Sequence, residues 1–279
     1  MITAALLLSA LSGAMHAQII TLTGESFKAL HGKQSGLYSF FTMQDGRLAP
    51  VPHQWVQWSE QGYPYFEQDD STDLVGDPAR IDAEDRLLLR FEDGGQPLDG
   101  PVTEQVAAEL AVEQAGETRF FYLVKNAYLQ NTDRYVQFDP QSMTIKSTDY
   151  ALSMADGNLF KWSDFYFRGF EGENGERQSI LDTLKLRLSA GLFGENNRVT
   201  LNNNNLDPKV KQVINGPLAA LVYASTSVTV AKVPVLRINN YFLVMPRQME
   251  IHSRFTLPGI AETVVKRPAL DISLDGNGL

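Results

Sequence analysis

The 279-residue sequence contains no cysteine, and this absence removes several kinds of chemistry at once. Disulfide bridges, thiolate metal sites, cysteine nucleophiles and an N-terminal lipidated cysteine are excluded. Basic residues are also in deficit, because 24 Lys and Arg stand against 33 Asp and Glu, for a formal charge of −9. Affinity for nucleic acid comes largely from cations on phosphates, so no nucleic acid is expected as a partner.

Histidine is scarce, and no familiar active-site motif is present. The four histidines form neither an HxH nor an HExxH arrangement, so a catalytic zinc site would need ligands from distant segments. GxSxG, Walker and GxGxxG motifs are also missing from the sequence. These absences favour a non-catalytic protein over an enzyme.

The sequence has no apolar run long enough for a membrane-spanning helix, but a short one opens the chain. Ala4–Leu11 is apolar, Ser12-Gly13-Ala14 is a run of small residues, and Ala17 follows. This pattern is typical of a secretory signal peptide over residues 1–17, cleaved after Ala14 or Ala17. The alternative is a buried N-terminal helix. We therefore expect a periplasmic or secreted protein without an integral membrane span.

The remaining chain consists mainly of short β-forming runs. Leu37–Phe41, Arg86–Phe91 and Tyr241–Val244 are examples, and Asp-Gly and Gly-Gly pairs follow many such runs. The stretch before Ala115-Gly116 could form a helix on propensity alone, but the aromatic run after it favours a hairpin. Only Ser179–Leu188 and Asp207–Val213 indicate short helices.

Many short strands with little helix predict an all-β fold of the antiparallel β-sandwich type. Charge divides the chain, since residues 1–117 carry a net charge of −12 and residues 118–279 carry +3. This asymmetry favours two β modules. We expect an acidic sandwich-like module over residues 18–125 and a larger antiparallel β domain over residues 126–279.

An acidic segment is the candidate metal site. Asp69, Asp70, Asp73 and Asp77 lie close together in the sequence, and calcium prefers the oxygen ligands that such loops supply. The spacing does not match an EF-hand loop, and a solvated acidic loop explains the same residues. Calcium is the cofactor that these four residues would hold.

An aromatic segment is the candidate ligand site. Trp55 and Trp58 would face opposite sides of an ideal strand, with one in the core and one exposed. Tyr63 and Tyr65 follow, and His53 precedes the pair. Exposed aromatic rings suit the apolar faces of sugars, although core packing is the commoner use of such side chains.

Three stretches resemble a group of uncharacterised exported bacterial β-rich proteins. They are Leu48–Gln54, which contains Val-Pro-His-Gln, Ile81–Phe91, which begins Ile-Asp-Ala-Glu-Asp, and Asn215-Gly216-Pro217. The resemblance covers about a fifth of the chain, and Arg86 stands where an acid is expected. It implies a periplasmic, sandwich-like protein and carries over no catalytic residue.

Together these features predict an exported, non-catalytic binding or structural protein of the bacterial envelope. Its expected partner is an extracellular polysaccharide or another envelope component. Two alternatives stay open. One is a carbohydrate-active enzyme on a large β-sandwich, and the other is an envelope assembly factor that offers an open sheet edge to partner strands.

Overall fold

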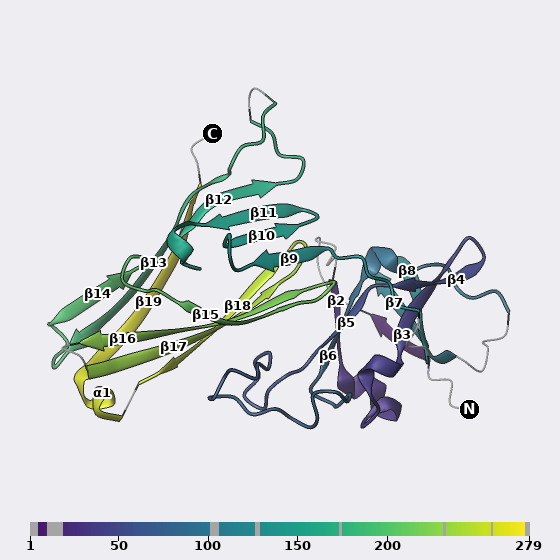
Figure 1. Cartoon of the computed structure of the whole chain (residues 1–279), viewed down its shortest axis with the longest axis horizontal. Helices are drawn as coiled ribbons and strands as arrows, with labels where there is room; N and C mark the ends of the chain where they lie inside the picture. The colour runs from purple at the N-terminus through teal and green to yellow at the C-terminus, as the bar shows by residue number, and fades with distance from the viewer. Residues whose placement is uncertain are drawn as a thin grey trace. The chain divides into compact units, whose positions relative to one another are not determined.

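The computed structural model describes residues 5–9, 19–100, 106–125, 129–172, 175–230, 233–257 and 259–276. These residues form five β-sheets, and all strand pairs but one are antiparallel, which confirms the predicted all-β class (Figure 1). Among the described residues, no helix has the length and apolar character that a membrane crossing requires.

The chain divides into two compact units. Unit 1 comprises Met1–Tyr135 and Gly216–Ala219, and unit 2 comprises Val136–Asn215 and Ala220–Leu279. Charge and composition place a boundary at residue 125. They do not predict that Gly216–Ala219 belongs to unit 1.

Unit 1 contains a five-stranded sheet in the order β1-β7-β8-β3-β4 and a three-stranded sheet in the order β2-β6-β5. Its strands are β1 (Ala5–Ser9), β2 (Ile19–Thr23), β3 (Ser39–Gln44), β4 (Arg47–Val51), β5 (His53–Val56), β6 (Arg86–Arg90), β7 (Val106–Gln114) and β8 (Glu117–Val124). Short 3-10 helices are η1 (Gly24–Leu30), η2 (Ser35–Leu37) and η3 (Phe91–Asp93).

Both sheets of unit 1 contribute to one core. Phe40 of β3, Leu87 and Leu89 of β6, and Phe121 and Leu123 of β8 are buried in the same cluster. The residues at i and i+2 on β6 and β8 share a face because side chains alternate along a strand. The residues of one face of each strand therefore meet in this core, although Leu88 and Tyr122 on the other faces are buried as well.

The β7–β8 hairpin confirms the interpretation of the stretch before Ala115. Ala115 and Gly116 have φ angles of 51° and 81°, and both positive values suit the two-residue turns that match strand twist. Strand β1 lies parallel beside β7, from Ala5 opposite Glu109 to Ser9 opposite Glu113. Residues 10–18 lie outside the described residues, so cleavage after Ala14 or Ala17 stays a prediction.

Unit 2 contains three sheets, in the orders β12-β11-β10-β9, β14-β13-β19 and β15-β16-β17-β18. Its strands are β9 (Val136–Asp139), β10 (Thr144–Ser147), β11 (Tyr150–Met154), β12 (Trp162–Phe167), β13 (Leu181–Leu192), β14 (Arg198–Asn202), β15 (Lys209–Asn215), β16 (Ala220–Val230), β17 (Val233–Val244), β18 (Met249–Thr256) and β19 (Val265–Gly276). The short helices are η4 (Ala155–Gly157) and α1 (Gly259–Val264).

The core of unit 2 draws on all three sheets. Phe138 and Leu152 come from the first, Leu186 from the second, and Val222 and Phe242 from the third. This shared core makes the sheets one packed body rather than three separate layers.

The two short helices expected in this unit are wrong. Ser179–Leu188 contributes most of its residues to β13, and Asp207–Val213 contributes to β15. Leu184, Leu186 and Leu188 of β13 are all buried, at a spacing of two residues. Burial of one strand face therefore outweighs the local helix propensity of the segment.

Candidate functional site: an apolar groove in unit 2

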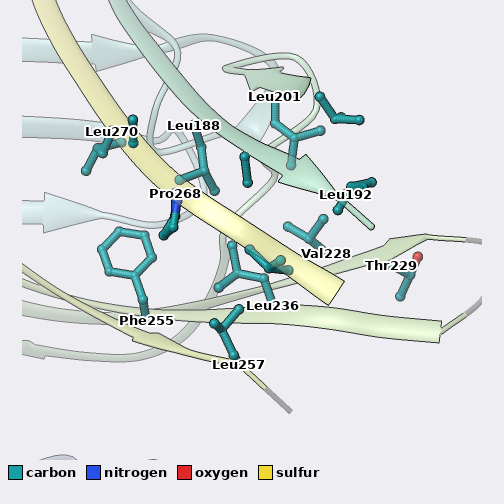
Figure 2. A pocket seen from close by; sticks show the side chains of 14 residues that line it. Leu188, Leu192, Leu201, Val228, Thr229, Leu236, Phe255, Leu257, Pro268 and Leu270 are labelled. Atoms are coloured by element: carbon teal, nitrogen blue, oxygen red, sulfur yellow. The ribbon is translucent and has the colours of Figure 1, made fainter. Parts of the chain in front are cut away.

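An apolar groove lies in unit 2 between the sheet that contains β13 and β19 and the sheet that contains β16, β17 and β18 (Figure 2). Its cavity measures about 390 Å³, and Thr229 is the only lining residue with a polar side chain. The other lining residues are Leu188, Ala190, Leu192, Val199, Leu201, Val228, Leu236, Phe255, Leu257, Val265, Pro268, Ala269 and Leu270.

A second cavity of about 180 Å³ shares Leu188, Phe255 and Leu270 with the first, and we treat both as one apolar groove. Its lining adds two polar side chains, Asn240 and Ser253. The remaining lining residues are Phe160, Trp162, Leu184, Leu186, Leu206, Ile238, Ile251, Ile272 and Leu274. No side chain that titrates near neutral pH lines either part.

Strands β13 and β19 build one wall from matched aliphatic pairs. Leu184 lies opposite Leu274, Leu186 opposite Ile272, and Leu188 opposite Leu270. The β13 members are buried, whereas Leu274, Ile272 and Leu270 are 58%, 61% and 42% exposed. The aliphatic face thus continues from the core to the open edge strand β19.

This exposed row is unusual for a folded chain. Single exposed aliphatic residues are ordinary, but a contiguous apolar surface beside a cavity is typical of a binding site. Phe255 and Ile251 of β18 extend the same surface and are also exposed. Both edge strands, β18 and β19, therefore offer apolar side chains to a ligand.

A buried amide lies in the wall of the groove. Asn240 of β17 is fully buried, and its Oδ1 accepts a hydrogen bond of 2.8 Å from Ser253 Oγ. Asn240 Nδ2 has no hydrogen-bond partner among the described residues. Either orientation of the amide leaves one atom unpaired, and an unpaired buried donor costs about 1–3 kcal/mol.

The aromatic residues predicted as a ligand site lie in unit 1 and are mostly covered. Strand β5 ends at Val56, so Trp55 and Trp58 do not share one strand. Trp58 is buried, and the guanidinium carbon of Arg86 lies 3.6 Å from the centroid of its ring. Trp55 is half-buried and packs edge-to-face on Phe27, with 5.6 Å between ring centroids.

The other members of this set are half-buried. The Tyr65 backbone N–H donates to Gln57 O at 2.9 Å, and Ser59 Oγ donates to Tyr63 O at the same distance. The His53 ring lies 5.3 Å from the Phe40 ring, and burial lowers the pKa of the imidazole. His53 therefore favours its neutral form.

The four aspartates predicted to bind calcium do not form one cluster. Asp69 is buried, and its carboxylate accepts hydrogen bonds from Ser71 and Thr72. Asp77 pairs with Arg80, while Asp70 and Asp73 are exposed. Within the described part of the chain, no three Asp, Glu, His or Cys side chains gather at metal-binding distance. A calcium site stays a prediction.

A different carboxylate is the most unusual one in unit 1. Asp85 is fully buried, and its Oδ2 accepts hydrogen bonds of 3.1 Å from Gln57 Nε2 and from the Asp82 backbone N–H. Burial raises the pKa of the Asp85 carboxyl to about 7. The sequence shows only an acidic run here, so it does not predict that Asp85 is buried.

Gln54 connects two of the stretches that carry the sequence resemblance. Its Oε1 accepts hydrogen bonds from the backbone N–H groups of Leu218 at 3.1 Å and Ala219 at 2.8 Å, and its Nε2 donates to Ala219 O. A Cβ on Gly216 would lie 2.2 Å from the Gln54 side chain, so this position favours glycine. Both motifs therefore serve the packing of unit 1.

Comparisons with known proteins leave the function open. No family model and no curated protein sequence matches the chain. Among solved structures, the chain is similar to an alpha-mannosidase from Enterococcus faecalis V583, at 9% sequence identity and a TM-score of 0.42. The similarity covers 84% of this chain and 28% of the mannosidase chain. A likeness of this degree assigns no activity to the present chain.

Proposed function

We propose that this protein is a non-catalytic binding protein of the bacterial envelope and that unit 2 holds the hydrocarbon part of an envelope lipid in the apolar groove. The observation that carries the proposal is the lining itself, in which Thr229, Asn240 and Ser253 are the only polar side chains. A lining without acid, base or nucleophile arrays suits retention of a ligand rather than its conversion.

The physical driving force is the removal of apolar surface from water. Each methylene group that enters such a groove contributes about 0.8 kcal/mol. Binding also covers the exposed rows on β18 and β19, so both partners lose unfavourable hydration.

The test is a titration of the full chain with a fluorescent fatty acid. In the double variant Ile272→Asn with Leu274→Asn, the groove edge becomes polar at positions that are already exposed, so folding should persist. We expect at least a tenfold loss of affinity. The matched control is Leu129→Asn, which changes a 51% exposed leucine of unit 1 and should bind like the parent. Equal affinity in all three proteins would refute the proposal.

Carbohydrate binding by the aromatic segment is a separate proposal with its own test. Tyr63 and Tyr65 are half-buried, so each presents part of its ring to solvent. If a polysaccharide stacks there, Tyr65→Ala should release the protein from an insoluble polysaccharide without changing its melting temperature. Trp58→Ala should destabilise the fold by about 3–5 kcal/mol, because that ring is buried. If the Tyr65→Ala variant is still retained on the polysaccharide, the proposal of carbohydrate binding by the aromatic segment is wrong.

A further inference from the structure

A corner at one end of the apolar groove presents an aromatic side chain to solvent. Phe193 follows β13 and is 80% exposed, the highest value among the large hydrophobic residues of the described chain. Its φ angle is 59°, in the left-handed region that phenylalanine seldom adopts. The Phe193 backbone N–H donates to Val264 O at 2.9 Å, and this hydrogen bond fixes the backbone of Phe193. Strained backbone of this kind concentrates at functional positions.

The same corner contains a second strained residue and several cations. Arg267 of β19 has a φ of 44°, beside an irregularity in the β13–β19 register between Ser189 and Gly191. Arg198 donates to Arg267 O, which joins the start of β14 to β19. The exposed cations are Arg198, Lys266 and Arg267, and Glu195 pairs with Arg267 at 3.0 Å.

This corner is continuous with the groove. Leu192 precedes Phe193, while Val265 and Pro268 flank Lys266 and Arg267, and all three of these apolar residues line the cavity. Figure 2 shows Leu192 and Pro268 on the two strands that form this wall. An exposed ring with basic neighbours therefore stands at the rim of an apolar cavity.

We propose that this corner docks onto the surface of a lipid bilayer that contains anionic headgroups, with Phe193 entering the interface. Aromatic rings favour the boundary between headgroups and acyl chains, and Lys or Arg side chains nearby strengthen binding to an anionic surface. Arg198 and Lys266 supply those contacts, while Glu195 offsets the charge of Arg267. Docking at this point brings the open end of the groove to the membrane.

The experiment is co-sedimentation of the full chain with vesicles of phosphatidylcholine, with and without phosphatidylglycerol. The parent protein should partition more strongly onto the anionic vesicles, and 0.5 M salt should weaken this preference by screening. The variant Phe193→Asn should partition at least fivefold less, because asparagine accepts the left-handed backbone but removes the ring. The control is Phe170→Asn, at another exposed phenylalanine of unit 2, which should partition like the parent.

Three outcomes overturn the docking proposal: no partition of the parent protein, equal partition of Phe193→Asn, or a parent dimer that Phe193→Asn converts to a monomer without vesicles. The last result would assign the corner to a second copy of the chain. Fatty-acid binding in solution separates this proposal from the function of the groove. Phe193→Asn should bind the fatty acid like the parent. A parent protein that partitions onto the vesicles but binds no fatty acid would refute the function of the groove and leave the docking proposal standing.

Discussion

Unit 1 places polar side chains inside its core, whereas unit 2 leaves aliphatic side chains on an open sheet edge. In unit 1, Asp85 and Gln54 are buried and hydrogen-bonded to loops. In unit 2, Ile272 and Leu274 face solvent beside a cavity. Gln54 is paired at both amide atoms and Asp85 at Oδ2, although Asp85 Oδ1 has no hydrogen-bond partner among the described residues. Hydrogen-bonded polar groups inside a core specify its packing, while an exposed apolar row adds nothing to the stability of a free protein. The difference indicates a structural role for the unusual residues of unit 1 and a binding role for those of unit 2.

The largest effect among the following variants tests the contact between Gly24 of η1 and the segment before β6 in unit 1. A Cβ on Gly24 would lie 1.7 Å from the backbone oxygen of Asp82, so Gly24→Ala must displace backbone. We expect a loss of about 3 kcal/mol in the free energy of unfolding. Gly36→Ala is the control, because no atom lies within 4 Å of its Cβ position and it should change little. Equal urea midpoints for the two variants would contradict the packing described here.

The next effect concerns the charge inside unit 1. Burial raises the pKa of Asp85 in the folded state to about 7, above the ordinary value of 3.8, so the unfolded chain releases this proton more readily. Stability should therefore fall as pH rises from about 4 to about 7 and level off above that range. Asp85→Asn should remove this contribution and stabilise the protein by about 2 kcal/mol at pH 8.

Urea unfolding between pH 4 and pH 8 measures this effect. Asp45→Asn is the control, because Asp45 lies exposed in the β3–β4 turn, and its profile should follow that of the parent. A parent profile that rises between pH 4 and pH 7 and is unchanged by Asp85→Asn would contradict the role assigned to this carboxyl.

A smaller effect tests the corresponding polar group of unit 2. Asn240→Leu removes an amide that lacks one partner, so the free energy of unfolding should rise by about 1 kcal/mol. The neighbouring Asn239 is the control, because its Oδ1 accepts hydrogen bonds from Ser225 and Arg237, and Asn239→Leu should destabilise. If both variants destabilise to the same degree, the unpaired amide of Asn240 does not lower the stability of unit 2.

The smallest effect concerns calcium in the acidic loop of unit 1. If Asp69, Asp70, Asp73 and Asp77 hold a weak ion, millimolar Ca²⁺ should raise the melting temperature by mass action. Asp70→Asn with Asp73→Asn should abolish the shift, since both side chains are exposed and their removal leaves the fold intact. No shift in the parent would leave these carboxylates as solvated loop residues, except for the buried Asp69.

The sequence predicts local structure well where one face of a strand is buried. The β-forming run that begins at Arg86 and the turn at Ala115-Gly116 both reappear in the structure as expected. It predicts the groove poorly, because β13 and β19 pair across about eighty residues of chain. The alternation of Leu270, Ile272 and Leu274 predicts an apolar strand face. It does not predict whether that face is buried or exposed, because this depends on the tertiary arrangement.

Calorimetric titration of the full chain with a medium-chain fatty acid, repeated at several temperatures, tests the central claim that unit 2 is a lipid-binding unit. Burial of a hydrocarbon chain in the apolar groove should give one site and a negative heat-capacity change. Both signals should disappear in the Ile272→Asn, Leu274→Asn variant and persist in Leu129→Asn. Saturable binding that the groove variant leaves unchanged, or no binding by the parent protein, would contradict the account.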